Sequence, residues 1–305
     1  MRFTFLLPAY KSAFLAEAIS GILKQTFTDF NVIVSDDASP EPIKEIVDGF
    51  DDGRISYRRN PVNFGAERLV EHWNTLVQGC EGEHLIMASD DDVYDERFLE
   101  EINALIESNP DKDLFASRCR IIDREGDTVR EEPDRGSLMD FGDICSFFTA
   151  PDSILCLGNY VFRTQALKAA GGFVGFPYAW KSDSATIMRM AGNGCAKTSS
   201  VLFSFRMSGR NISSQKGDAE VCRKKLDAVL GFKEWSDRLF ASKEFDSTPI
   251  RKNISRRLEG ELRDYYRVLS FREFFRLYGR LLKERWFYSL RNKLSFVVGY
   301  FVRKS

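Results

Sequence analysis

Four short apolar runs alternate with longer amphipathic segments over the first third of the chain. Each short run is rich in β-branched or aromatic residues, and each longer segment carries its apolar residues at helical spacing. Such alternation implies right-handed crossovers and a mostly parallel sheet covered by helices. Ser12 is the expected N-cap of the first helix. We therefore expect an α/β fold with strands at 3–7, 32–34, 55–58 and 85–88 and helices at 12–23, 42–50, 66–78 and 95–106.

The alternation becomes irregular beyond residue 110. Residues 114–122 are predicted to form a further strand and residues 125–127 a turn. The charged stretch 130–143 is predicted to be a mobile loop that acts as a lid. Residues 164–170 favour a short helix that ends at the glycine pair 171–172.

Two of the expected strands end in acidic residues. Asp36 and Asp37 follow the second strand, and Asp90, Asp91 and Asp92 follow the fourth. Parallel strands bring their carboxyl ends to one edge of the sheet, where open α/β folds bind ligands. Clustered carboxylates repel one another unless a cation or several donors hold them, and an oxygen-only set suits Mg²⁺ or Mn²⁺. The sequence thus predicts a metal site that grips phosphate, with solvated turns or helix N-termini as the alternative.

Several common functional classes are excluded by motifs that the chain lacks. Neither GxxxxGK[ST] nor GxGxxG is present, so a backbone cradle for phosphate is not expected. The two histidines, His72 and His84, lie in apolar periodic segments, which favours packed rings over a histidine-based triad. The six cysteines include no CxxC pair, which argues against zinc ribbons and a disulfide framework.

Composition and hydropathy favour a globular protein of the cytoplasm. The chain has 305 residues with 43% hydrophobic content, enough to bury a large core. No apolar run approaches the roughly 18 residues of a membrane span. The apolar run at 3–7 is too short for a signal peptide and is followed by Pro8. We therefore expect a cytoplasmic location.

Positive charge is concentrated at the carboxyl-terminal end. Residues 251–305 contain 15 Lys or Arg against 5 Asp or Glu, although the whole chain has a net charge of −1. Twelve aromatic residues, among them Trp286 and Phe287, are interleaved with these bases at helical spacing. Basic and aromatic helix faces suit an anionic membrane surface, here the inner face of the cell membrane. Helices that simply pack on the rest of the protein are the alternative, and nucleic acid is not expected as a partner.

Short motifs occur in a fixed order over residues 3–215. They are Pro8-Ala9-Tyr10 with Lys11, Gln25-Thr26-Phe27, Asp36-Asp37-Ala38-Ser39, Asn63-Phe64-Gly65 with Asn74 and Gly82-Glu83, Ser89-Asp90-Asp91-Asp92, Phe162-Arg163 with Gly171-Gly172-Phe173, Ser182-Asp183, and Arg206 with Asn211-Ile212-Ser213. Their order resembles that of the family 2 glycosyltransferases of the GT-A fold. Four residues depart from the usual pattern of that family, namely Lys11, Ala38, Ala88 and Ser182.

The resemblance implies a particular architecture. Residues 1–215 would form a GT-A glycosyltransferase catalytic domain, a Rossmann-like three-layer unit with a mostly parallel central sheet. Residues 216–305 would form a C-terminal helical region that is basic and aromatic.

The resemblance also implies roles for individual residues. Asp183 would be the catalytic base, with an ordinary helix N-terminal position as its alternative. Asp90 and Asp92 would be the ligands of Mn²⁺ or Mg²⁺. The residues expected to bind the donor nucleotide are Pro8, Ala9, Tyr10, Asp36, Asp37, Asn63, Asp90, Asp91 and Arg206.

The implied activity is a metal-dependent transfer of a sugar with inversion. The donor would be a nucleotide sugar, with a UDP-sugar expected, and the acceptor a saccharide or a lipid-linked saccharide of bacterial surface polysaccharide biosynthesis. Two alternatives stay open. One is a metal-dependent nucleotidyltransferase or phosphatase, which would not need Asp183, and the other is a noncatalytic relative that binds sugar nucleotides or glycans.

Overall fold

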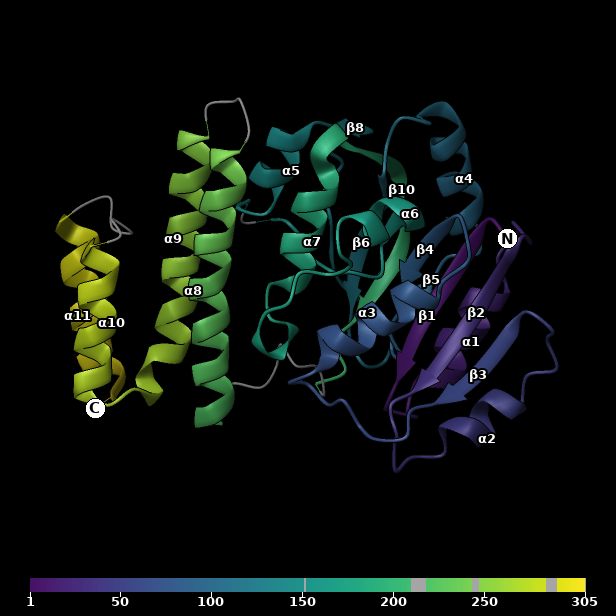
Figure 1. Ribbon diagram of the computed structural model, residues 1–305, viewed down its shortest axis with the longest axis horizontal. Helices are drawn as coiled ribbons and strands as arrows, with labels where there is room; N and C mark the ends of the chain where they lie inside the picture. Colours follow the sequence, from purple (N-terminus) through teal and green to yellow (C-terminus); the bar gives the residue numbers. More distant parts are fainter. Residues whose placement is uncertain (151, 210–217, 243–246, 284–289, 305) are drawn as a thin grey trace.

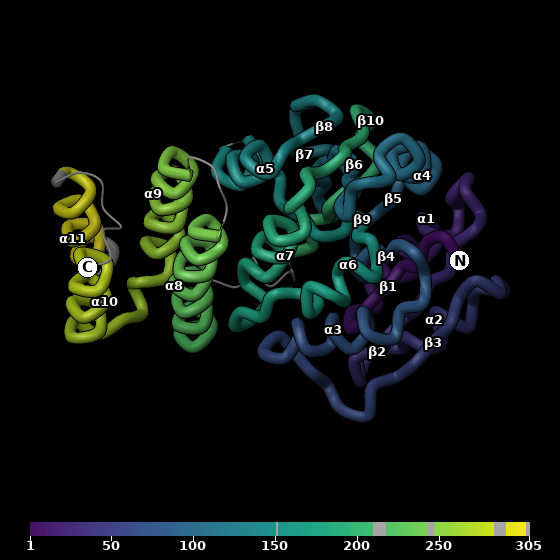
Figure 2. The backbone as a smooth tube through the Cα atoms, turned by 45° about the horizontal axis from the view of Figure 1, so that its top comes forward, coloured from purple at the N-terminus to yellow at the C-terminus, as the bar shows by residue number. Residues whose placement is uncertain are grey.

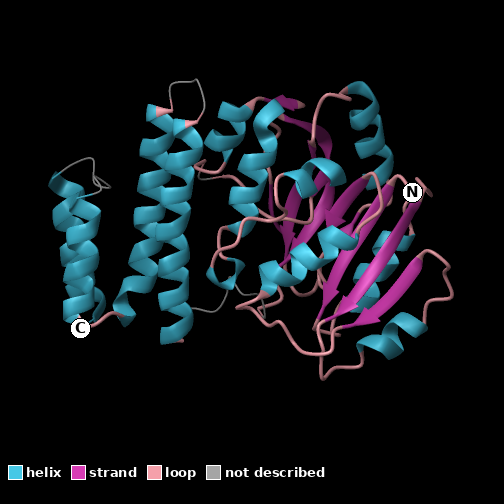
Figure 3. Cartoon of the chain, in the orientation of Figure 1, coloured by secondary structure: helices cyan, strands magenta, loops and turns pink. Residues whose placement is uncertain are grey.

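The computed structural model describes residues 1–150, 152–209, 218–242, 247–283 and 290–304 (Figure 1). A twisted sheet with helices on both faces forms the part that contains the amino terminus (Figure 3). Four long helices extend from one side of this part toward the carboxyl terminus (Figures 1 and 2). Among the described helices, none has the length and apolar character needed to cross a membrane.

Strands from the first third of the chain form a parallel half-sheet. β1 pairs in parallel with both β2 and β4, and β3 pairs in parallel with β2. The order β3-β2-β1-β4 confirms the predicted crossovers, because no two of these strands are joined by a tight hairpin. The strands are β1 Phe3–Ala9, β2 Phe30–Asp36, β3 Ile55–Arg59 and β4 His84–Met87.

The other half of the sheet is mixed. β9 lies antiparallel between β4 and β6, and β10 pairs in parallel with β6 and antiparallel with β5. Two short strands add to this half, since β7 pairs with β6 and β8 with β10. The bounds are β5 Val93–Tyr94, β6 Leu114–Ile122, β7 Thr128–Glu131, β8 Leu138–Met139, β9 Tyr160–Arg163 and β10 Cys195–Arg206.

Two apolar cores lie on the two faces of the sheet. Alternate residues of β1 point to opposite faces, so that Phe5 and Leu7 belong to one core and Leu6 to the other. The first core packs under α1 (Leu15–Leu23), α2 (Ile43–Asp48) and α4 (Phe98–Ser108). The second packs under α3 (Leu69–Gly79), α5 (Phe141–Phe147), α6 (Thr164–Ala169) and α7 (Ser182–Met190). This arrangement confirms the expected three layers.

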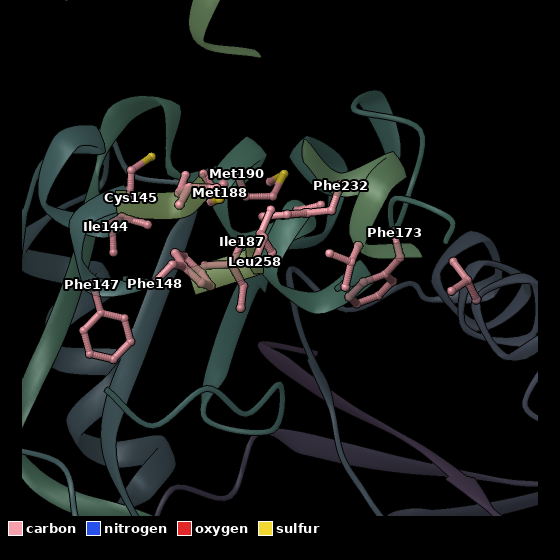
Figure 4. Close-up of a cluster of buried hydrophobic side chains, with 14 of the residues drawn as sticks. Ile144, Cys145, Phe147, Phe148, Phe173, Ile187, Met188, Met190, Phe232 and Leu258 are labelled. Atoms are coloured by element: carbon pink, nitrogen blue, oxygen red, sulfur yellow. The ribbon is translucent and has the colours of Figure 1, made fainter. Parts of the chain in front are cut away.

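The second core continues into the carboxyl-terminal helices. Phe232 of α8 (Ala219–Ala241) and Leu258 of α9 (Thr248–Tyr265) are buried in the same apolar cluster as Ile187 and Met188 of α7 (Figure 4). The packing alternative therefore holds for these two helices. The predicted domain boundary at residue 215 lies outside the described residues and stays a prediction.

α10 (Phe271–Lys283) and α11 (Leu290–Lys304) are the elements farthest from the sheet (Figure 2). They pack on the end of α9 through a cluster of rings. Phe274 of α10 stacks on Tyr300 of α11 at 3.8 Å between ring centroids, and both rings lie near Tyr266. Trp286 and Phe287 lie outside the described residues.

Two local expectations are wrong. Ser12 does not cap α1, because its backbone N–H and its hydroxyl both donate to Glu41, at 2.6 and 2.7 Å, and the helix begins at Leu15 without a side-chain cap. The stretch 130–143 is not a loop throughout, because it contains the end of β7, all of β8 and the start of α5, and its role as a lid stays a prediction. Glu132 within it is buried, forms an ion pair with Lys197 and accepts the backbone N–H of Cys119.

Candidate active site

A cavity of about 980 Å³ lies at the carboxyl ends of β1, β2 and β4. The loops that follow these strands, α3, the segment before α7 and α9 contribute to its wall. It gathers most of the residues that the sequence singles out. Those that line it are Pro8, Ala9, Tyr10, Asp37, Asn63, Asp90, Asp91, Asp92 and Asp183.

Asp90 is fixed by the strand beside it. β1 and β4 run in parallel, and the pairing extends beyond β4 through the Ala88 N–H, which donates to the carbonyl of Leu6 at 2.8 Å. This brings the carboxylate of Asp90 to the end of β1. There it accepts the backbone N–H groups of Tyr10 and Lys11, at 3.0 and 2.8 Å.

Asp91 and Asp92 have different partners. Asp91 accepts the hydroxyls of Ser89 and Ser208, at 2.7 and 2.9 Å, and the ammonium of Lys11. Asp92 accepts the backbone N–H of Arg206 at 3.0 Å. All three residues of the triplet are buried, with at most 4% of each exposed, so their carboxylates lie in a region of low polarity at the floor of the cavity.

Burial favours the protonated forms of Asp90 and Asp92. It raises the pKa of Asp90, and neighbouring Asp91 acts in the same direction while Lys11 opposes it. Burial and then Asp91 raise the pKa of Asp92 further. A carboxylate in this state strongly favours a nearby cation. For Lys11 itself burial lowers the pKa, but the attraction of Asp90 and Asp91 outweighs it and the net direction is upward.

The two acids at the end of β2, Asp36 and Asp37, have different surroundings. Asp36 is fully buried, accepts the hydroxyl of Tyr57 at 2.6 Å and forms an ion pair with Arg59. Its other oxygen accepts the backbone N–H of Ser39 at 2.8 Å, which stabilises the turn through Ala38 at φ 51°. Asp36 does not line the cavity, so the prediction that it binds nucleotide is not supported by the geometry.

Asp37 faces the cavity. Its carboxylate accepts the side-chain amide of Asn60 at 2.9 Å and the backbone N–H groups of Phe64 and Gly65 at 3.0 and 3.2 Å. The ring of His72 stacks on Phe64, with centroids 5.1 Å apart. Burial lowers the pKa of His72, with Asp37 opposing, so the ring is neutral at neutral pH. His72 is therefore a packed ring, as predicted, but one that also lines the cavity.

Asp183 lines the cavity from the first turn of α7. Its Oδ1 accepts the backbone N–H of Ser184 at 2.6 Å, and no described residue donates to its Oδ2. Burial is the main cause that raises its pKa, opposed by the bond from Ser184 and by the charge of Lys181. Asp183 is thus both a helix N-terminal residue and a cavity residue with a free oxygen.

The segment before Asp183 has an unusual backbone. Tyr178, Ala179 and Lys181 have positive φ angles of 57°, 53° and 72°, a region that costs energy for residues other than glycine. All three line the cavity. Lys181 reaches α9, where its ammonium contacts Glu261 at 2.6 Å. Backbone strain of this kind is concentrated at functional sites. Here the strained segment leads into α7, and its residue Lys181 contacts α9.

The family of the chain follows from its sequence. The family model described as glycosyl transferase family 2 matches residues 4–169, more than half of the chain. The chain belongs to glycosyl transferase family 2. The resemblance drawn from the motifs is thereby confirmed, and members of this family transfer a sugar from a nucleotide sugar.

Solved structures of glycosyltransferases share the fold of this family 2 member. TarS 1–349 of S. aureus in complex with UDP-GlcNAc is 17% identical, with a TM-score of 0.61, and the match covers 100% of this chain and 89% of that one. The mannosyltransferase PcManGT of Pyrobaculum calidifontis, in complex with GDP-Man and Mn²⁺, is 14% identical, with a TM-score of 0.59, and the match covers 99% and 86%. These likenesses confirm the GT-A fold.

Arg206 of this family 2 member occupies a different place from the one predicted. Its side chain is 98% buried, and its guanidinium contacts Glu17 of α1 at 2.6 Å and the backbone carbonyl of Asp91 at 3.0 Å. It also stacks on Phe14 at 4.4 Å from the ring centroid. Arg206 does not line the cavity, so it supports the acidic triplet from behind. The motif partners Asn211, Ile212 and Ser213 lie outside the described residues.

Four charged residues that line the cavity of this glycosyltransferase have no place in the predicted site, namely Lys11, Lys181, Arg257 and Glu261. Lys11 contacts the triplet, and Arg257 and Glu261 come from α9 and lie on the side of Asp183. In the sequence, Lys11 is distinguished only as a departure from the usual pattern of the family. Arg257 and Glu261 stand in a segment rich in charge, so nothing in their local sequence distinguishes them from solvated residues.

The acidic triplet fits a divalent cation in its chemistry. Within the described ranges no group of three or more side chains is arranged as a closed metal site. Two hard carboxylates at a cavity wall nevertheless suit Mn²⁺ or Mg²⁺, because these ions fill their remaining positions with water and with phosphate oxygens of a substrate. Asp90 and Asp92 are the residues that would hold it, next to space large enough for a nucleotide sugar.

Proposed function

We propose that this glycosyltransferase moves a hexosyl group with inversion from a UDP-sugar to a saccharide or lipid-linked acceptor, with Mn²⁺ or Mg²⁺ as cofactor. The expected setting is bacterial surface polysaccharide biosynthesis. One observation carries the proposal. A single cavity joins Asp37 after β2, the triplet that follows β4 and the carboxylate of Asp183.

The donor would lie along the floor of this cavity. Pro8, Ala9, Tyr10 and Asn63 line the part near Asp37, where the nucleoside would bind. Asp37 retains acceptor capacity beyond the three donors it already has, because a carboxylate offers about four lone-pair sites. It would accept the imide N–H of uracil, which favours uridine.

The diphosphate would lie over the triplet. When bound, a divalent cation neutralises charge that develops on the leaving phosphate oxygens. Asp90 and Asp92 would hold this cation, and Asp91 would contact the donor. The buried carboxylates need little rearrangement at the moment of reaction, because backbone N–H groups already fix Asp90 and Asp92.

Asp183 would act on the acceptor. Its free Oδ2 would take the proton from the attacking hydroxyl while the bond between the anomeric carbon and the diphosphate breaks. Attack from the side of Asp183, with departure toward the triplet, gives inversion in one displacement. A raised pKa suits this role, because a base of higher pKa takes a proton from a hydroxyl more readily.

Part of the surface favours attachment to an anionic membrane. Exposed apolar residues follow one stripe of α11, namely Leu294, Val298 and Val302, at four-residue spacing. Beside them Arg263 and Arg291 line a groove of about 710 Å³ between α9 and α11. Apolar stripes flanked by arginine suit the headgroup region of an anionic bilayer, so we propose a peripheral location on the inner face of the cell membrane.

The test of the proposed activity is calorimetric titration of UDP, GDP and dTDP into the protein, each with Mn²⁺ and with EDTA. We expect UDP to bind with Mn²⁺ and to lose most of its affinity in EDTA and in Asp92→Ala. Asp111→Ala, an exposed aspartate outside the cavity, is the control and should bind as the wild type does. Failure of all three nucleotides to bind would favour the noncatalytic alternative.

A further inference from the structure

The ammonium of Lys11 lies between two acids of the triplet. Its Nζ is 3.1 Å from Oδ1 of Asp90 and 2.9 Å from Oδ2 of Asp91. The two carboxylates are nearly inaccessible, at 6% and 3% exposed, whereas the side chain of Lys11 is 24% exposed at the cavity wall. The ammonium of Lys11 thus already places a positive charge beside the carboxylates of Asp90 and Asp91.

The backbone holds Lys11 in this place. Its own N–H and that of Tyr10 both donate to Oδ2 of Asp90, so the ammonium takes the remaining oxygen of the same carboxylate. Residue 11 therefore contacts Asp90 through two separate groups. The backbone bonds do not involve the ammonium, so movement of the partly exposed side chain away from the carboxylates would leave them in place.

Asp92 differs from its two neighbours. Its Oδ1 accepts a backbone N–H, and no described cationic side chain lies within ion-pair distance of it. The three acids therefore differ in their partners, because the single ammonium of Lys11 is shared by Asp90 and Asp91 whereas Asp92 has only one neutral donor among the described residues. A divalent cation would therefore find Asp92 without a cationic partner and Asp90 and Asp91 already paired with Lys11.

We propose that Lys11 is a built-in counter-ion of Asp90 and Asp91 that competes with the divalent cation for Asp90. The metal then binds weakly to the empty cavity and binds well only together with the donor. The negative diphosphate provides a new partner for the displaced ammonium, so Lys11 moves from the carboxylates to the phosphate oxygens. The joint binding of metal and donor rests on the proposed function. The competition between Lys11 and the metal does not, because it requires no bound donor.

The physical reason is mutual repulsion of cations at short range. An ammonium and a divalent ion cannot share carboxylate oxygens about 3 Å away without strong repulsion in a buried setting. The diphosphate relieves this repulsion because it adds negative charge at the same wall. Arginine at position 11 would keep the competition, whereas an apolar side chain of similar length would abolish it.

Mn²⁺ affinity without nucleotide tests the competition. Calorimetry or the electron paramagnetic resonance signal of free Mn²⁺ would compare wild type, Lys11→Met, Lys11→Arg and the control Lys24→Met, an exposed lysine outside the cavity. We expect Lys11→Met to bind Mn²⁺ at least tenfold more tightly than the wild type. Lys11→Arg and Lys24→Met should stay within about threefold of it.

Thermal unfolding gives a second readout. Lys11→Met should have a lower Tm than the wild type in EDTA, because two buried carboxylates lose their cation, and Mn²⁺ should raise its Tm by more than it raises that of the wild type. Lys11→Gln serves in its place if the methionine variant does not fold. Unchanged or weaker Mn²⁺ binding by the neutral variant would overturn the proposal.

Nucleotide binding separates this inference from the proposed function. UDP affinity in EDTA should fall in Lys11→Met, opposite in sign to the gain in Mn²⁺ affinity, and a merely structural lysine would lower both. If no nucleotide binds the wild type, the proposed function fails, while the Mn²⁺ comparison still decides whether Lys11 competes.

Discussion

At the scale of single residues, aspartates in and near the cavity have the same side chain but different partners. Asp36 is neutralised by Arg59 and Tyr57 and stabilises a turn. Asp92 is buried with one neutral donor, and Asp183 keeps one oxygen free toward the cavity. Their positions in the sequence look alike, since each stands at the end of a strand or the start of a helix. The partners determine which one stabilises the fold and which one is available for chemistry.

Asp183→Asn should reduce sugar transfer by roughly 10²- to 10⁴-fold, the usual contribution of a general base. UDP affinity should stay unchanged, because the proposed nucleoside and diphosphate sites do not include Asp183. Comparison of the initial rate of transfer with calorimetry of UDP on the same preparation tests both statements. An asparagine variant with wild-type turnover would remove Asp183 from the mechanism.

The same residue predicts a pH dependence. Burial raises the pKa of Asp183, and only its ionised form can accept a proton. The transfer rate should therefore fall on acidification, at a higher pH than an ordinary aspartate would give.

At the scale of elements, β10 connects the acidic triplet to α1. Arg206 at the end of β10 is 98% buried, and its guanidinium donates to the backbone carbonyls of Asp91 and Arg124 as well as to Glu17. The triplet therefore depends on a strand more than a hundred residues further along the chain. Loss of this guanidinium leaves buried carbonyl groups without donors.

Arg206→Ala should lower the free energy of unfolding by about 3 kcal/mol, measured by urea denaturation. Glu17→Gln is the matched control and should cost less than about 1 kcal/mol, because Glu17 is 53% exposed. Wild-type stability of Arg206→Ala combined with loss of UDP binding would restore Arg206 as a nucleotide contact.

Elements with a regular pattern were predictable, and those fixed by distant partners were not. The short apolar run of β1 and the helical spacing in α4 are local signals, so both elements were expected close to their observed bounds. The stretch 130–143 was expected to be a loop because its sequence is rich in charged residues. Its order depends on Lys197, which meets Glu132 only after β10 has formed.

The candidate site shows the same division. The acids at strand ends were predictable because parallel strands share one edge. The contribution of α9 was not, since Glu261 reaches the cavity only through the packing of α9 near α7. Arg206 was misplaced because a motif gives the position of a residue in the chain but not the direction of its side chain.

At the scale of the whole molecule, the protein places the candidate active-site cavity and a surface with exposed apolar and arginine side chains on one chain. α8 and α9 are packed into the second core, so they are continuous with the sheet (Figure 4). α10 and α11 lie beyond them and carry the exposed apolar stripe together with Arg291 (Figure 1). An enzyme attached to a membrane through this end would hold its cavity near lipid-linked acceptors.

Vesicle sedimentation tests the attachment. Full-length protein should sediment with vesicles that contain phosphatidylglycerol and stay in solution with phosphatidylcholine alone. Leu294→Glu with Val298→Glu should reduce the sedimented fraction at least fivefold, because both side chains are more than half exposed on α11. Lys24→Glu is the control for charge alone. Equal sedimentation of the double variant would rule out this surface as the membrane contact.

The most direct test of the central claim is donor hydrolysis followed by NMR, with UDP-hexoses, Mn²⁺ and no acceptor. A sugar transferase whose base and metal site meet in one cavity should release free sugar slowly from at least one donor, with inverted anomeric configuration. EDTA and Asp92→Ala should each stop the release. Complete stability of every UDP-, GDP- and dTDP-sugar, or release that Asp92→Ala leaves unchanged, would contradict the account.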